Sequence, residues 1–164
     1  MDLIDRKILD VLQDDATLSM AELGERVGLS ATPCWRRVQR LEAAGVIARR
    51  VVLLDRAQLN VGTTVFVAIR TREHSAEWLE RFATTIAEIP EVVDFYRMSG
   101  DVDYLLRLVV PDIAAYDQVY KKLIKVDGLS DVTSTFAMEE IKHTTALPLG
   151  YAGGDGARGG SRQR

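Results

Sequence analysis

Arginine side chains concentrate in one short part of this chain. Between residues 30 and 50 the sequence holds five arginines and a single acidic residue, Glu42. The planar guanidinium group can pair with two acceptors at once, on a phosphate or on the edge of a guanine base. Their type and spacing therefore indicate that this part of the chain contacts nucleic acid. The five arginines are Arg36, Arg37, Arg40, Arg49 and Arg50.

The net charge of −3 hides this local excess. Residues 61–147 carry nine basic residues against fourteen acidic ones, whereas residues 1–60 carry nine of each. A DNA-binding surface needs a positive field only where it meets the duplex. The charge distribution therefore suits a DNA-binding element in an otherwise acidic protein.

Residues 30–45 are predicted to form the helix that carries three of these arginines. Ser30 or Thr32 can cap its start, Pro33 is tolerated in a first turn, and Gly45 suits a helix end. At about 100° per residue, one side of this helix is apolar and the other polar. The apolar stripe holds Cys34, Val38, Leu41 and Gly45, and the opposite side holds Thr32, Arg36, Gln39, Arg40 and Ala43.

Other residues of this helix border the stripe. Trp35 lies about 100° from its centre, so DNA contact and packing at the edge of the core are both open. Arg37 lies nearer the packing side, which favours an ion pair inside the protein. Cys34 is the only cysteine and is expected to be a buried structural thiol. The alternative to a DNA-reading helix is an ordinary amphipathic helix with solvated arginines.

The preceding residues predict the rest of a helix-turn-helix. Residues 2–14 repeat apolar side chains at helical spacing, and a shorter helix follows over residues 19–28. Two short helices joined by a glycine-containing turn, the second basic on its free side, are typical of this motif. The first helix is expected to supply the apolar floor beneath them.

A wing is predicted directly after the basic helix. Residues 46–55 are rich in β-forming side chains and include Arg49 and Arg50. Such a strand would lie along the DNA backbone and contact phosphates. We therefore predict a winged helix-turn-helix DNA-binding domain over residues 1–60.

The second half of the chain repeats the order strand, helix, strand. Strands are predicted over residues 64–70, 92–98, 104–110 and 131–138, and helices over residues 75–89 and 112–128. Two βαβ units predict a ferredoxin-like βαββαβ domain over residues 61–148, so the fold class is α+β. The uncovered sheet face would show apolar side chains such as Phe66, Phe95 and Leu106, which predicts a homodimer.

A loop at residues 98–104 combines glycine with two carboxylates. Gly100, Asp101 and Asp103 suit a tight turn, and a structural role is one interpretation. The other is a ligand site, because a carboxylate accepts from the ammonium of a free amino acid and loop amides donate to its carboxylate. Both interpretations remain open from these residues.

Three blocks together resemble the Lrp/AsnC, or feast/famine, transcription regulators. They are LIDRKIL at residues 3–9, LSATPCWRRV at residues 29–38 and RLEAAGVI at residues 40–47, and the similarity continues to about Pro148. In that family the third helix enters the major groove of double-stranded DNA. The resemblance therefore implies DNA contacts by Thr32, Trp35, Arg36, Gln39 and Arg40, in agreement with the helical wheel.

The resemblance also implies an amino-acid effector that binds between dimers, in a RAM/ACT-like domain. Carried over residue by residue, its site comprises Gly100, Asp101, Asp103, Tyr104, Thr135, Phe136 and Ala137. Homodimers that assemble into a tetramer or an octamer are expected. Residues 32–35, 74–78 and 130–139 look closest to the cysteine-responsive, cysteine-detoxification subgroup, which makes cysteine the first candidate effector. No other cofactor and no metal is expected.

No apolar run approaches the length of a membrane span, and the N-terminus lacks the basic start and apolar block of a secretion signal. A cytoplasmic protein is expected. Residues 149–164 are rich in glycine with three arginines, and are expected to form a disordered tail.

An enzyme is the main alternative class, and it is disfavoured. His74 and His143 are isolated, and Cys34 has no plausible histidine partner. Asp101 and Asp103 fall short of a full cation site. Two alternatives are kept: a siroheme-decarboxylase-like enzyme, since some of these enzymes resemble feast/famine regulators, and an amino-acid-sensing regulatory subunit that does not bind DNA.

Overall fold

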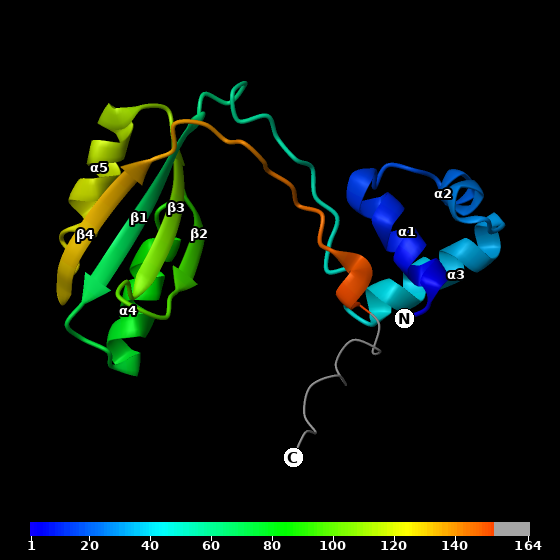
Figure 1. Ribbon diagram of the computed structural model, residues 1–164, viewed down its shortest axis with the longest axis horizontal. Helices are drawn as coiled ribbons and strands as arrows, with labels where there is room; N and C mark the ends of the chain where they lie inside the picture. The colour runs from blue at the N-terminus through cyan, green and yellow to red at the C-terminus, as the bar shows by residue number, and fades with distance from the viewer. Residues whose placement is uncertain (153–164) are drawn as a thin grey trace, which may run out of the picture. The chain divides into compact units, whose positions relative to one another are not determined.

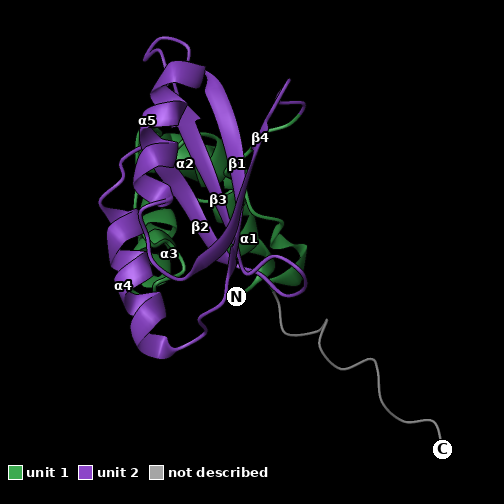
Figure 2. Cartoon of the chain, turned by 90° about the vertical axis from the view of Figure 1, so that its left-hand side faces the viewer, with its two compact units in different colours: residues 1–52, 142–164 green, residues 53–141 purple. Residues whose placement is uncertain are grey.

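Residues 1–152 of this chain, described in a computed structural model, form two separate units (Figure 1, Figure 2). Among the described residues, the first unit holds Met1–Val52 and residues 142–152, and the second holds Leu53–Ile141. The sequence predicted boundaries at 60/61 and 148/149, so both lie earlier than expected. Both boundaries are set by contacts of the connecting segments with one unit or the other, and residue composition does not reveal such contacts.

The segment after Val52 belongs to the second unit because the Arg56 side chain forms hydrogen bonds and an ion pair with residues of that unit. Its guanidinium donates to the carbonyls of Val61 and Gly62, both at 3.4 Å, and to Thr64 Oγ1 at 2.7 Å. It also pairs with Glu140 at 3.2 Å. Residues 53–62, which the sequence divided between the two domains, are therefore part of the sheet unit.

The end of the described chain packs on the first unit. Gln13 Nε2 donates to the Leu147 carbonyl at 3.3 Å, and the Leu147 amide donates to Gln13 Oε1 at 2.6 Å. The short 3-10 helix η1 (Leu149–Tyr151) follows, and Leu149 packs against the core of this unit. The tail predicted to be disordered from residue 149 is thus structured at its start, and residues 153–164 lie outside the described residues.

The first unit is built from helices α1 (Leu3–Asp14), α2 (Met20–Val27) and α3 (Ala31–Ala43) (Figure 1). A capping box starts α1, since Asp2 and Asp5 each accept from the other's amide, at 2.8 and 3.1 Å. Ser19 and Glu22 form the equivalent box at α2. The three predicted helices are confirmed.

A tight turn joins α2 to α3 and depends on two glycines. Gly28 adopts φ = 76°, a left-handed conformation that glycine enters without strain. A Cβ on Gly24 would lie 2.6 Å from the carbonyl oxygen of Leu29, so no larger residue fits there. Cys34, Val38 and Leu41 of α3 face the core as predicted, and burial raises the pKa of the Cys34 thiol.

The predicted wing strand over residues 46–55 is not formed. This segment has no strand structure, although Val46 and Ile47 donate to the Leu41 carbonyl and so close the end of α3. A strand needs a neighbour for its backbone groups, and no described part of this single chain pairs with residues 48–54. Val51 through Leu54 are exposed in consequence.

The second unit has the predicted ferredoxin-like arrangement. Its elements are β1 (Thr63–Thr71), α4 (Ala76–Ala87), β2 (Val92–Arg97), β3 (Tyr104–Val110), α5 (Ile113–Leu123) and β4 (Leu129–Phe136). The antiparallel sheet has the order β2-β3-β1-β4, and α4 and α5 lie on one face of it (Figure 2). Side chains from that sheet face form a single core with the two helices.

The other sheet face is less apolar than predicted. Phe66 lies on it, partly exposed, but Leu106 is fully buried on the helix side. Phe95 pairs in register with Leu106 and also packs in the helix-side core. An irregularity between Val92 and Asp94 shifts the alternation of β2, which sequence spacing alone does not reveal.

None of the described helices is both long enough and apolar enough to cross a membrane.

Candidate DNA-binding and effector sites

The side of α3 that faces away from the core is exposed. It carries Thr32, Trp35, Arg36, Gln39 and Arg40. Trp35 is 50% exposed, so its ring is not fully packed against the core. Arg36 has no ion-pair or hydrogen-bond partner among residues 1–152. The exposed side is the one that the helical wheel predicted, and its contact with DNA remains a prediction.

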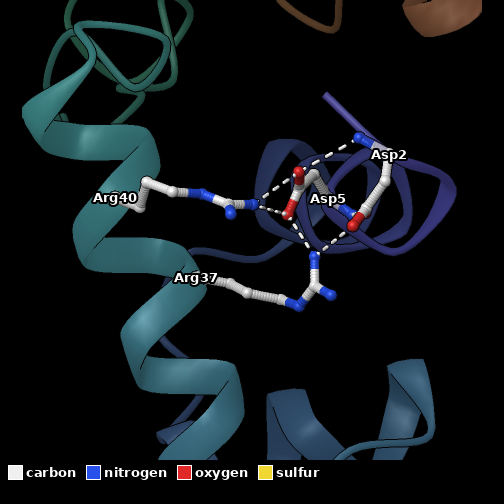
Figure 3. Close-up of polar contacts among 4 residues, drawn as sticks. All are labelled: Asp2, Asp5, Arg37 and Arg40. Atoms are coloured by element: carbon white, nitrogen blue, oxygen red, sulfur yellow. Dashed lines mark hydrogen bonds and ion pairs between the residues drawn. The ribbon is translucent and has the colours of Figure 1, made fainter.

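Asp5 lies at the centre of a polar network between α1 and α3 (Figure 3). Its carboxylate accepts from Arg37 Nη1 at 2.8 Å and from Arg40 Nη2 at 2.9 and 2.8 Å, one distance for each oxygen. Arg37 Nη1 also donates to Asp2 at 2.6 Å. The internal ion pair predicted for Arg37 is therefore present, and Asp2 and Asp5 are its partners.

Arg40 has a partner that the sequence did not predict, and its contact with DNA remains a prediction. One nitrogen of its guanidinium is bound to Asp5, although the side chain as a whole is 61% exposed. Asp5 was not predicted as a functional residue. Two features of the sequence could have identified it. Asp5 occupies the N3 position of a capping box at the start of α1, and Arg37 was expected to face the inside of the protein and to need an acidic partner.

Two further polar residues of this unit have partners. Gln39 donates to Glu42 at 2.9 Å, and Arg50 pairs with the other oxygen of Glu42 at 3.1 Å. Arg49 is exposed. Glu42 therefore offsets part of the positive charge near the C-terminal end of α3, and Arg36 lies outside this pairing.

The network changes the acidity of its carboxylates. Hydrogen bonds from Arg37 and from the Asp5 amide lower the pKa of Asp2 from 3.8 to about 2. Burial raises the pKa of Asp5, but the hydrogen bonds from Arg37 and the Asp2 amide and the charge of Arg40 outweigh it, so the net shift is downward. Both carboxylates stay ionised well into the acid range.

Acidification is therefore expected to weaken the first unit. A pKa lowered in the folded state contributes stability above the ordinary value of 3.8, and this contribution is lost as pH falls toward about 2. We expect Asp2→Asn to reduce the loss of stability between pH 5 and pH 2.5, measured by urea unfolding with circular dichroism. Asp10→Asn, which changes an exposed carboxylate of α1, is the control. An identical pH dependence in both variants would contradict the role of Asp2.

The loop before β3 is bonded into the fold through Asp103. The Thr71 amide donates to Asp103 Oδ2 at 2.8 Å, and the Asp103 amide donates to the Ile69 carbonyl at 3.0 Å. His74 Nδ1 lies 3.9 Å from Asp103 Oδ1. Asp101 is exposed and has no hydrogen-bond partner among the described residues. The turn interpretation therefore fits Asp103, and Asp101 is the carboxylate open to a ligand.

The predicted effector residues do not form one cluster within a single chain. Phe66 pairs with Thr135, whereas Ile69 pairs with Tyr104, and β4 and β3 flank β1 on opposite sides. Thr135 and Tyr104 are therefore separated by roughly 10 Å along the strand direction and by roughly 10 Å across the sheet. A single amino acid is too small to touch both groups in one chain.

Two of the predicted effector side chains point into the core. Tyr104 is buried against Trp78 and Phe82, with ring centroids 5.9 and 5.4 Å apart. Phe136 packs edge-on against Tyr116 at 5.3 Å. Strand alternation turns both side chains toward the helix side of the sheet, where Tyr104 is buried and Phe136 is half-buried. Within residues 1–152 no cluster of three or more histidine, cysteine or acidic side chains could hold a metal ion.

Comparison with known proteins gives matches across both units. A family model described as the Lrp/AsnC ligand binding domain matches residues 64–147, and one described as winged helix-turn-helix DNA-binding matches residues 1–48. The glutamate uptake regulatory protein of Zymomonas mobilis is 56% identical over 149 residues, which span 91% of each chain.

Two further matches are similarly complete. The DNA-binding transcriptional activator DecR of Escherichia coli K12 is 53% identical over 150 residues, covering 91% of this chain and 99% of that protein. The solved structure of the transcriptional regulator NMB0573 from Neisseria meningitidis in complex with L-Met matches with a TM-score of 0.88. It is 38% identical and covers 93% of this chain and 99% of that one.

Proposed function

This chain belongs to the Lrp/AsnC family and is a DNA-binding transcription regulator, not an enzyme, and we propose that the exposed side of α3 reads the duplex while the C-terminal unit senses an amino acid. The observation that carries the DNA proposal is the exposure of Arg36 beside Thr32 and Trp35 on the side of α3 opposite its core contacts. A helix of this kind fits the major groove, where arginine pairs with guanine.

We assign two kinds of DNA contact. Arg49 and Arg50 follow α3 on an exposed segment and contact phosphates, which position the protein without reading sequence. The exposed side chains of α3 contact base edges, and they are Thr32, Trp35, Arg36, Gln39 and Arg40. A regulator of this kind must share a compartment with the chromosome, so we place it in the cytoplasm.

We further propose that the chain acts as a homodimer that assembles into a tetramer or octamer. Two features support this proposal. Val51 through Leu54 are exposed, apolar and unpaired within the described chain, and the open sheet face carries Phe66 and Tyr96. Pairing two copies would cover these surfaces and present two α3 helices to a roughly palindromic site.

The effector site then requires two copies. Gly100, Asp101 and Asp103 from one chain would meet Thr135 and the backbone of residues 136–137 from another, since these groups lie apart within one chain. Asp101 would accept from the ammonium group of the amino acid, and loop amides would donate to its carboxylate. Cysteine is the first candidate, and glutamate and methionine are the competitors that the names of similar proteins suggest.

The test measures how amino acids change DNA affinity. Labelled duplex is first recovered by the wild-type protein from a random library at low salt, and its affinity is then measured by fluorescence anisotropy with each of the twenty amino acids. We expect one amino acid to change the affinity about fivefold or more, because coupling between sites is commonly of this size. Asp101→Ala should abolish the response while leaving the affinity without effector unchanged, because the exposed Asp101 side chain makes no hydrogen bond or ion pair among residues 1–152.

Asp103→Ala is a less clean probe, because it also removes the hydrogen bond from the Thr71 amide. Failure to recover any duplex at low salt would contradict the DNA proposal. Equal affinity in the presence of every amino acid, or an unchanged response in Asp101→Ala, would contradict the effector proposal alone.

A further inference from the structure

Asp5 of α1 makes contacts that suggest a role beyond stability. We propose that Asp5 is a positioning residue for DNA reading, which holds Arg40 so that the free part of its guanidinium faces the duplex in one orientation. This inference rests on the proposed role of α3. It assigns part of the sequence selectivity to a residue that does not itself touch DNA.

The geometry around Asp5 is the first step. Its carboxylate is 2% exposed, whereas the Arg40 side chain that it binds is 61% exposed. Nη2 of Arg40 lies between the two carboxylate oxygens, at 2.9 and 2.8 Å (Figure 3). Asp5 is itself fixed by the Asp2 amide and by Arg37 Nη1, so its position does not depend on Arg40.

What remains free on Arg40 is the second step. Only Nη2 has a partner among residues 1–152, which leaves the donors on Nε and Nη1 open at the surface. A long side chain normally loses conformational freedom when it binds, and a side chain fixed in advance loses less. Arg40 therefore presents a fixed plane of donors, in contrast to Arg36, which has no partner among the described residues.

Charge is the third step. Asp2 and Asp5 carry two negative charges against the two positive charges of Arg37 and Arg40, so the network as a whole is neutral. Neutrality weakens the attraction to any phosphate backbone, which is the sequence-independent part of DNA binding. Arg40 then contributes through geometry more than through charge. Loss of the Asp5 charge should raise non-specific affinity while it lowers selectivity.

The experiment compares Asp5→Asn with Asp2→Asn in the full-length protein. Both variants remove one negative charge from the network, but only Asp5 contacts Arg40. Affinity is measured for the selected duplex and for a shuffled duplex of the same composition, at several salt concentrations. We expect Asp5→Asn to bind the shuffled duplex more tightly than wild type and to lower the ratio of selected to shuffled affinity about tenfold. Asp2→Asn should raise both affinities and keep the ratio.

A second variant covers the case in which Asp5→Asn fails to fold. Arg40→Lys keeps the charge, but an ammonium cannot hold Asp5 and offer a fixed plane of donors at once. We expect it to lower the ratio as Asp5→Asn does, with the salt dependence on the shuffled duplex unchanged. In the double variant Asp5→Asn/Arg40→Ala, the ratio should equal that of Arg40→Ala alone.

The outcomes separate the two proposals. A wild-type protein that selects no duplex contradicts the proposed function. A selective wild-type protein whose ratio survives both Asp5→Asn and Arg40→Lys overturns the positioning role and leaves the proposed function intact. Purely structural damage would lower the affinity for both duplexes together, and that result in folded Asp5→Asn also overturns the inference.

Discussion

Replacing Arg36 and Arg40 together with alanine should lower the affinity for the selected duplex about hundredfold. The two guanidiniums occupy the exposed side of α3, and each contact with a base edge adds discrimination that no neighbouring side chain replaces. The salt dependence should also become shallower, because Arg36 is a charged group without a partner among residues 1–152. Anisotropy titrations at three salt concentrations measure both quantities.

The matched control removes two positive charges from the other unit. Arg72 and Arg81 are exposed, and their double replacement with alanine should change the affinity far less. If both double variants weaken binding equally, general charge and not α3 governs the interaction. If neither weakens it, a surface other than the exposed side of α3 carries the DNA contact.

Replacing Phe82 with alanine should destabilise the C-terminal unit by about 3–5 kcal/mol. Phe82 is 1% exposed and stacks on Trp78 with ring centroids 4.9 Å apart. It also contacts Phe95 at 5.5 Å and Tyr104 at 5.4 Å. The variant leaves a cavity among the three remaining aromatic rings, which the neighbours cannot fill. Urea unfolding followed by circular dichroism measures the loss.

The same cavity should impair effector sensing. Tyr104 directly follows the loop that contains Asp101 and Asp103, so a shift of its ring displaces the loop backbone. We expect Phe82→Ala to lose the effector response before it loses DNA affinity, since α3 belongs to the other unit. Thr84→Ala on the exposed side of α4 is the control and should change stability by less than about 0.5 kcal/mol. An unchanged stability in Phe82→Ala would refute this account of the core.

Local patterns in the sequence were sufficient to predict the helices of the first unit and the strands and helices of the second. Apolar spacing and capping residues such as Ser19 identified the three N-terminal helices, because both signals act within a few residues of chain. The repeated order of strands and helices predicted the sheet unit for the same reason. Strand boundaries such as Tyr104–Val110 and the exposed side of α3 agreed with the structure. The family followed from motifs of the same local kind and is confirmed by the family models.

The tertiary structure decided which of these residues meet. Pairing of Asp5 with Arg40 joins positions 35 residues apart, and nothing local marks them as partners. The register between strands placed Leu106 in the core and separated Thr135 from the loop before β3, since a shift of one residue exchanges the faces of a strand. The wing segment has the composition of a strand, but a strand forms only where another backbone accepts its hydrogen bonds. Residue type and spacing thus determined the helices, the four strands of the sheet and the family, and long-range contacts decided which side chains are free to act.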